Sequence, residues 1–254
     1  MNILLFLRSV RKQLPIASLL LVVLSIGTGL ADAADAPIDL EQIFRQSEQV
    51  LAGVDNYTAL FHKQERVRGK LLPAEKVALK FKKPFQVYMK WVAEPHKGRE
   101  TLFVEGANEN RLKGHEGGLL GVLTVNLDPN GARAMKYNRH PITDSGLEKL
   151  VAKLAANVRL GRANGELEVR DRGEETVYGR KTTRLEGVFP KEKASAYYCH
   201  RAVVNIDMEL NVPIKVQIFD AEDELVELYG YEDLRMNAGL TQKDFEPSNA
   251  DYGF

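Results

Sequence analysis

The sequence predicts a mainly β protein of the α+β class, in which an antiparallel sheet packs against two amphipathic helices. Its central stretch, residues 77–91, alternates apolar and polar side chains on both sides of Pro84. Residues 166–234 continue this alternation in runs separated by turn residues. Residues 40–54 and 147–160 carry apolar stripes at helical spacing. The sheet and the helices each have one apolar side, so we expect these sides to be buried against each other.

The N-terminal 33 residues have the features of a secretory signal peptide. A basic start from Arg8 to Lys12 precedes an apolar run over residues 14–30, which ends in the small-x-small pattern Ala31-Asp32-Ala33. The alternative is an uncleaved membrane anchor, which the short length of the run and its proline and two glycines disfavour. We therefore expect an exported, periplasmic protein that is cleaved near Ala33, with one domain over residues 34–254.

Charge and cysteine content limit the function classes. The chain has 35 basic and 35 acidic residues, and loss of residues 1–33 leaves a formal charge of about minus two. This balance argues against nucleic acid as a partner and against a polybasic protein that binds membrane surfaces. Envelope membrane proteins are expected as possible partners. Cys199 is the only cysteine, so no internal disulfide can form. We expect a monomer.

The first half of the chain is expected to form one helix and four strands. Asp39 is placed to cap a helix from Leu40 to about Val54. The polar sequence that follows marks a turn. Lys83 and Pro84 form the joint between the two central strands, because proline cannot donate to a ladder hydrogen bond. The four strands are expected at residues 57–67, 77–82, 85–91 and 99–105.

The second half begins irregularly and becomes a meander. Residues 114–138 are rich in turn signals and have one short expected strand, 123–127. Ser145 and Glu148 have capping-box spacing before the helix that starts at Leu147. The tail after Asn237 is polar and is expected to pack little beyond Phe245. The later strands are expected at residues 166–171, 176–188, 196–208, 212–219 and 224–234.

No catalytic or metal-ligand motif is recognisable in the sequence. The five histidines lack metal-ligand spacing, so we expect no metal and no cofactor. Cys199 and His200 are neighbours on an expected strand and point to opposite faces, which disfavours a thiol nucleophile. The acidic run 220–224 lies in an expected hairpin turn, where a solvated turn is favoured over an ion site. Arg139 and His140 remain a weaker ligand candidate in a loop. We predict that the protein is not an enzyme.

The pattern resembles the LolA/LolB-like superfamily of periplasmic lipoprotein carriers. The resemblance is carried by the first helix, by the hairpin that closes at Gly106, and by the segments Leu79 to Pro84, Met89 to Trp91, Pro213 to Asp220, Tyr231 to Leu234 and Asn237 to Leu240. Residues 138–146 are not part of the carrier pattern, which suggests a separate family within that superfamily.

The resemblance implies an incomplete antiparallel β-barrel that is open at one side and covered by helices. In the carriers, the apolar hollow of this barrel takes acyl chains, which implies a role in lipoprotein sorting and outer membrane biogenesis. An arginine precedes the hairpin proline in the carriers and helps to hold the lid shut, and Lys83 stands in that place here. Lysine lacks the guanidinium fork, so the same bonds are not available to it.

We expect a carrier for lipid or lipoprotein acyl chains. The alternative is a scaffold module whose barrel is filled by its own side chains, and a periplasmic hydrolase is a weaker third candidate. The residues expected to line the hollow and bind lipid are Leu79, Phe81, Val87, Met89, Trp91, Val204, Ile206, Val216 and Ile218. They are expected to be covered by both helices, and the lid or gate residues are Lys83, Leu147, Leu150 and Leu154.

Overall fold

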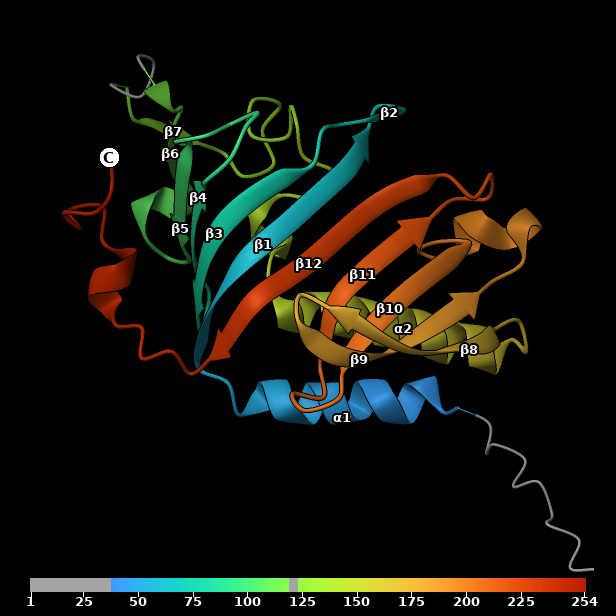
Figure 1. Ribbon diagram of the computed structural model, residues 1–254. Coiled ribbons are helices and arrows are strands. Elements are labelled where there is room, and N and C mark those ends of the chain that lie inside the picture. The colour runs from blue at the N-terminus through green and yellow to red at the C-terminus, as the bar shows by residue number, and fades with distance from the viewer. Residues whose placement is uncertain (1–37, 119–122) are drawn as a thin grey trace, which may run out of the picture. The chain divides into compact units, whose positions relative to one another are not determined.

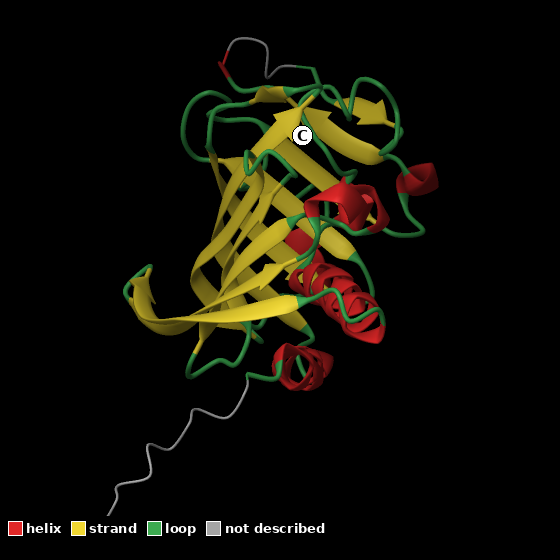
Figure 2. Cartoon of the chain, turned by 90° about the vertical axis from the view of Figure 1, so that its right-hand side faces the viewer, coloured by secondary structure: helices red, strands yellow, loops and turns green. Residues whose placement is uncertain are grey.

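Twelve strands form one strongly curved antiparallel sheet, shown in Figures 1 and 2. A computed structural model describes residues 38–118 and 123–254, so the predicted signal peptide at residues 1–33 lies outside the described residues. The strands run β7-β6-β5-β4-β3-β1-β12-β11-β10-β9-β8 across the sheet, and β2 pairs with β1. Their bounds are β1 Asn56–Val67, β2 Lys70–Leu71, β3 Glu75–Lys82, β4 Gln86–Trp91, β5 Glu100–Val104, β6 Leu112–His115, β7 Val125–Leu127, β8 Glu168–Val177, β9 Arg180–Val188, β10 Arg201–Asp207, β11 Pro213–Phe219 and β12 Leu225–Met236.

The first and last long strands meet in the middle of the sheet. Strand β1 pairs with β12, where Phe61 stands opposite Tyr231, and its other edge pairs with β3, where Phe61 stands opposite Val77. This pairing joins two meanders, β3 to β7 and β8 to β12. Strands β7 and β8 are the two ends of the order, so the barrel is incomplete. The predicted fold class is confirmed.

Two long helices cover the sheet on one side (Figure 2). Helix α1 spans Leu40–Ala52, and its N-cap is Asp39 as predicted, with the Asp39 carboxylate accepting the Gln42 N–H at 3.1 Å. Helix α2 spans Leu147–Ala163 and pairs with α1 through an ion pair between Arg159 and Glu48 at 3.0 Å. Among the described residues, no helix is both long and apolar enough to cross a membrane.

The start of α2 differs from the predicted capping box. Gly146 is the N-cap with φ of +117°, and no side chain caps the helix. A Cβ at this glycine would lie 3.1 Å from the Phe81 ring, so both the backbone and the close packing require glycine. The Leu147 N–H donates instead to the Tyr57 hydroxyl at 2.9 Å. A tertiary hydrogen bond therefore replaces the local one that the Ser145 spacing suggested.

Several predicted boundaries in the second meander are also wrong. The strand expected at 176–188 is divided by a two-residue hairpin turn at Tyr178 and Gly179, both with positive φ, as a type I′ turn requires. Tyrosine is unusual there, so the sequence signal was weak. The beginning of the strand expected at 196–208 is non-regular, because Lys191–Ala196 forms the 3₁₀ turn η4. Strand β6 was not predicted, since its alternation is broken by Gly114.

The tail after Asn237 packs more closely than predicted. Phe245 is buried, and the Tyr252 ring stacks on Tyr88 of β4 with ring centroids 3.8 Å apart. The Gly253 N–H also donates to the Glu100 carboxylate at 3.1 Å. The tail therefore covers the outer face of β4 and β5. Tyr88 stands on the polar side of the alternation in residues 77–91, yet it is buried under this tail.

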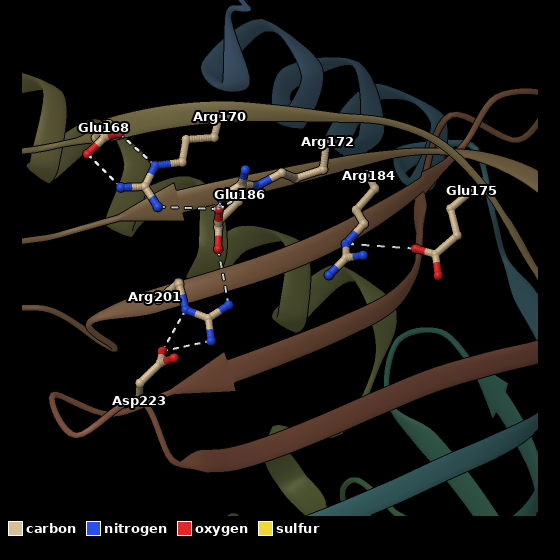
Figure 3. A network of polar contacts seen from close by, with 8 residues as sticks. All are labelled: Glu168, Arg170, Arg172, Glu175, Arg184, Glu186, Arg201 and Asp223. Atoms are coloured by element: carbon tan, nitrogen blue, oxygen red, sulfur yellow. Dashed lines mark hydrogen bonds and ion pairs between the residues drawn. The ribbon is translucent and has the colours of Figure 1, made fainter.

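The outer face of β8 to β10 carries a network of charged side chains (Figure 3). Its centre is Glu186 of β9, which is only 5% exposed and lies within ion-pair distance of Arg170, Arg172 and Arg201. Arg201 continues the network to Asp223 in the turn after β11. These contacts join three neighbouring strands through alternating charges. Glu186 therefore neutralises arginines that would otherwise repel one another.

Candidate functional site

A cavity of about 1040 Å³ lies inside the first half of the sheet. Its floor is formed by the inward side chains of β1, β3 to β7 and β12, and it is covered by residues 129–146, which we call the cover segment, and by the first turns of α2. The large aliphatic and aromatic residues that line it are Phe61, Val77, Leu79, Met89, Trp91, Leu112, Leu123, Val125, Leu127, Ile142, Leu150, Tyr137, Tyr198, Tyr229 and Tyr231.

Three of the nine predicted lipid-binding residues line this cavity. They are Leu79, Met89 and Trp91, on adjacent strands β3 and β4. Val204 borders a second, much smaller cavity of about 20 Å³, which lies beside both helices. The other five, Phe81, Val87, Ile206, Val216 and Ile218, are buried in the core and border neither cavity.

The helices account for this distribution. In the half of the sheet formed by β9 to β11, side chains of α2 such as Leu154 and Val158 are buried in the same core as Val204 and Val216. The space beside Phe81 is likewise filled, because its ring stacks on that of Tyr57 with ring centroids 4.9 Å apart. One half of the barrel is thus filled and the other is hollow. Helix α1, which was expected to cover the hollow, does not line it.

The predicted lid residues lie where α1, α2 and the β3–β4 turn meet. The Lys83 ammonium donates to the carbonyl oxygens of Leu51 at 2.8 Å and Ala52 at 3.4 Å, at the end of α1, and lies 3.5 Å from the Glu148 carboxylate of α2. A cation at a helix C-terminus satisfies carbonyls that lack intrahelical partners. Lys83 therefore ties both helices to the hairpin.

The three predicted lid leucines have different surroundings. Leu150 lines the large cavity, Leu154 borders the small one, and Leu147 is fully buried. A lid or gate role for these residues and for Lys83 stays a prediction.

Two buried carboxylates hold the cover segment against the sheet. Glu65 of β1 and Glu227 of β12 stand directly opposite each other, and they are 4% and 0% exposed. Glu65 accepts the Arg139 N–H at 2.7 Å. Glu227 lies 2.6 Å from the Arg139 Nε and 2.9 Å from the His140 Nε2. Lys63, beside Glu65, donates to the side chain of Asn138.

The same carboxylates are satisfied by two tyrosines on the inner face. The Tyr229 hydroxyl donates to Glu65 at 2.6 Å, and the Tyr198 hydroxyl donates to Glu227. Burial by itself would raise the pKa of Glu227, but hydrogen bonds from His140 and Tyr198 and the charge of Arg139 outweigh it and hold this pKa below its ordinary value. Glu227 is thus ionised, and its three donor residues, Arg139, His140 and Tyr198, secure the cover segment rather than leave a free reactive group.

The remaining sequence candidates have structural partners. Cys199 is buried, and burial together with Glu227 raises the pKa of its thiol to about 12, which disfavours a thiolate. The His200 ring contacts the Phe189 carbonyl oxygen at 2.5 Å. In the acidic turn, Asp223 pairs with Arg201 at 2.7 Å. Within the described residues, no cluster of three or more histidine, cysteine, aspartate or glutamate side chains could hold a metal ion.

The sequence reading missed Lys63, Glu65 and Glu227, although a signal was present. Strand alternation places Glu65 on the same face as Phe61, and Glu227 on the same face as Tyr229 and Tyr231. A charged residue on the apolar face of a strand indicates a buried ion pair or a site. His140 was the weaker loop candidate, and it does line the cavity.

The fold and the cavity define a class of protein in which an open, curved antiparallel sheet encloses an apolar hollow. Buried ion pairs and hydrogen bonds hold the cover segment over this hollow. Within this class, the chain belongs to the family described as "Protein of unknown function (DUF1571)", whose model matches residues 54–254. No curated protein matches the sequence.

The structure is similar to several solved structures at low sequence identity. The lipoprotein LppX of Mycobacterium tuberculosis shares 12% identity with a TM-score of 0.48, covering 79% of this chain and 96% of LppX. A putative outer membrane lipoprotein-sorting protein domain from Vibrio parahaemolyticus shares 13% with a TM-score of 0.38, covering 82% and 97%. A LolA superfamily protein from Nitrosomonas europaea shares 9% with a TM-score of 0.33, covering 82% and 98%.

Proposed function

We propose that this protein is a non-enzymatic periplasmic carrier that binds an acyl chain of a lipid or lipoprotein in its cavity. The observation that carries the proposal is the hollow of about 1040 Å³, whose floor is mostly aliphatic and aromatic. Small-molecule sites typically measure roughly 300–1,000 Å³ and are lined mainly by apolar and aromatic side chains. The cavity is large enough and apolar enough for a long hydrocarbon chain.

Burial of methylene groups is the energetic basis of such binding. Side chains such as Leu79 and Met89 border empty space and lack the contacts that a filled core would give them. Each methylene buried there contributes about 0.8 kcal/mol, so a chain of about fourteen contributes on the order of 11 kcal/mol. Much of this is offset by the cost of association. A bilayer offers a similar gain, so transfer of the chain lies near balance.

The inner polar residues support binding over catalysis. Both oxygens of Glu65 and both of Glu227 accept hydrogen bonds from side chains or backbone of this protein. Groups that are fully satisfied by one another fasten structure, whereas a general acid or base needs a free position for its substrate. The proposal therefore assigns these residues to closure of the cavity.

The location in the envelope rests on the N-terminal sequence. The signal-peptide pattern of residues 1–33 supports export. A carrier in the periplasm would exchange its chain with membranes or membrane proteins of the envelope.

The second candidate is a scaffold module with a filled barrel. It is favoured by the packing under the helices, where Val204, Val216 and Ile218 are buried in a continuous core. This packing accounts for one half of the sheet only. The void in the other half is what a carrier needs and a filled module does not, so we give the carrier priority.

The test fills the cavity from its cover. Ala134 lines the cavity, whereas Ala132, two residues earlier, is exposed and does not. Ala134→Trp should weaken binding of a fluorescent fatty-acid probe about tenfold or more, since an indole takes the space of several methylenes. Ala132→Trp should bind as wild type does. Absence of probe binding by folded wild type, or equal binding by both variants, would reject the proposal.

A further inference from the structure

Among the described charged residues that line the cavity without an ion pair, basic residues outnumber acidic ones. We call the part of the lining that carries these basic residues the cavity mouth. Within residues 38–118 and 123–254, five basic side chains line the cavity without an ion pair: Lys97, Arg133, Lys136, Lys149 and Lys153. Only two acidic residues of the lining, Glu94 and Asp144, are likewise without one in this part of the chain.

The other acidic residues of the lining already have cationic partners. Glu65 pairs with Lys63 at 3.3 Å, Glu100 with Lys90 at 2.9 Å, and Glu116 with Arg99 at 2.8 Å. The interior network is neutralised in the same way, because Glu227 is paired with Arg139. These carboxylates are therefore occupied, and the positive charge of the mouth remains available to a ligand.

Two of the lysines of the cavity mouth share one face of α2, and the Lys149 ammonium also donates to the Thr143 carbonyl oxygen. Lys149 and Lys153 are four residues apart, and Leu150 beside them lines the cavity as well. The Lys149 ammonium lies 4.3 Å from the centre of the Phe85 ring and the Lys153 ammonium 4.8 Å from that of Tyr198. An aromatic face holds an ammonium group in place without cancelling its charge. Both lysines are thus positioned where the apolar floor gives way to solvent.

The cover segment contributes further positive charge at this border. The Lys136 ammonium lies 4.8 Å from the centre of the Tyr137 ring, and Arg133 lines the cavity from the same segment. Four of the five cations thus come from α2 and the cover segment, and Lys97 comes from the β4–β5 loop, whereas most of the aliphatic and aromatic lining lies on the strands. The site is divided into an apolar part and a cationic part.

From this division we infer that the ligand is an anionic amphiphile, with its hydrocarbon chain on the strands and a carboxylate or phosphate head group at the lysines of α2. The inference rests on the proposed function, which requires only the chain. It adds that the head group is selected by charge. A neutral head group gains no charge pairing, and a cationic one meets an excess of positive charge, whereas an anionic one forms ion pairs with Lys149 and Lys153.

Displacement of the neutral dye Nile red by four amphiphiles of one chain length tests this inference. Laurate and lauryl phosphate represent the two anionic head groups, lauryl alcohol the neutral one and lauryl trimethylammonium the cationic one. The anions should displace the dye at concentrations roughly three- to tenfold lower than the alcohol does, since partly exposed ion pairs are individually weak. This preference should shrink at high salt. If only laurate or only lauryl phosphate displaces the dye better than the alcohol does, the site prefers the head group of that anion.

Matched double variants assign the preference to α2. In Lys149→Gln/Lys153→Gln, the advantage of the anions over lauryl alcohol should disappear. Lys181→Gln/Lys243→Gln removes the same charge at exposed positions outside the cavity and should keep the advantage. Equal displacement by anions and alcohol in wild type would overturn the inference and leave the proposed function intact. Failure of Nile red and all four amphiphiles to bind would reject both.

Discussion

Removal of the Glu227 carboxylate should release the cover segment from the sheet. Glu227 is fully buried and receives donors from Arg139, His140 and Tyr198. In Glu227→Gln, the amide presents hydrogens to groups that also donate, and the Arg139 cation loses its partner. The Arg139 side chain is 39% exposed and stays hydrated, so the main cost is that of buried groups left without a hydrogen-bond partner, about 1–3 kcal/mol. We expect a decrease of that size in the free energy of unfolding.

Urea unfolding and amide hydrogen exchange measure the two parts of this expectation. Exchange should accelerate in residues 129–146, since the bonds that fasten them are lost, while the core of β1 and β12 exchanges only as global stability dictates. Glu224→Gln is the matched control, because Glu224 is largely exposed and forms a single ion pair among the described residues, with Arg66 at 3.3 Å. It should change stability by less than about 1 kcal/mol. Unfolding and exchange of Glu227→Gln within error of wild type would refute the role of Glu227 as a fastener.

Three further predictions concern the tail, the pH dependence and the N-terminus. Tyr252→Ala should lower the unfolding free energy by about 1–3 kcal/mol, measured by thermal unfolding, because its ring stacks on the buried Tyr88, and exposed Asp251→Ala should change it little. Glu186 and Glu227 have lowered pKa values in the folded state, so their contribution to the unfolding free energy should be fully present above pH 4.5, the ordinary pKa of glutamate, and should fall as the pH drops below it. Urea unfolding that does not change with pH over that range would contradict this. N-terminal sequencing of exported protein should begin near Ala34, and retention of Met1 would exclude cleavage.

Much of the fold could be predicted because its strands follow local rules. The alternation over residues 77–91 and the Pro84 joint gave β3 and β4, and Asp39 gave the start of α1. The pairing of β1 with β12 joins opposite ends of the chain, and no local pattern encodes it. The start of α2 was predicted wrongly for the same reason, since the Leu147 N–H donates to Tyr57 on a strand distant in sequence.

The site was predicted only in part. Alternation assigned Leu79, Phe81, Val87 and Met89 to one face, but it does not show whether a helix fills the space opposite each of them. Leu79 and Met89 line the void, whereas Phe81 and Val87 lie in filled core. The ion pairs and hydrogen bonds that hold the cover segment join residues 139–140 to β1 and β12. The only indication of them in the sequence was the presence of charged residues on an apolar strand face.

The most direct test of the account is the content of the cavity in protein purified from an envelope fraction without detergent. Native mass spectrometry with lipid extraction should find an acyl-chain lipid bound to wild type and to Ala132→Trp, and much less bound to Ala134→Trp. An empty wild type that also takes up no lipid from vesicles, or equal lipid on both tryptophan variants, would contradict the claim that the hollow beneath residues 129–146 carries an acyl chain.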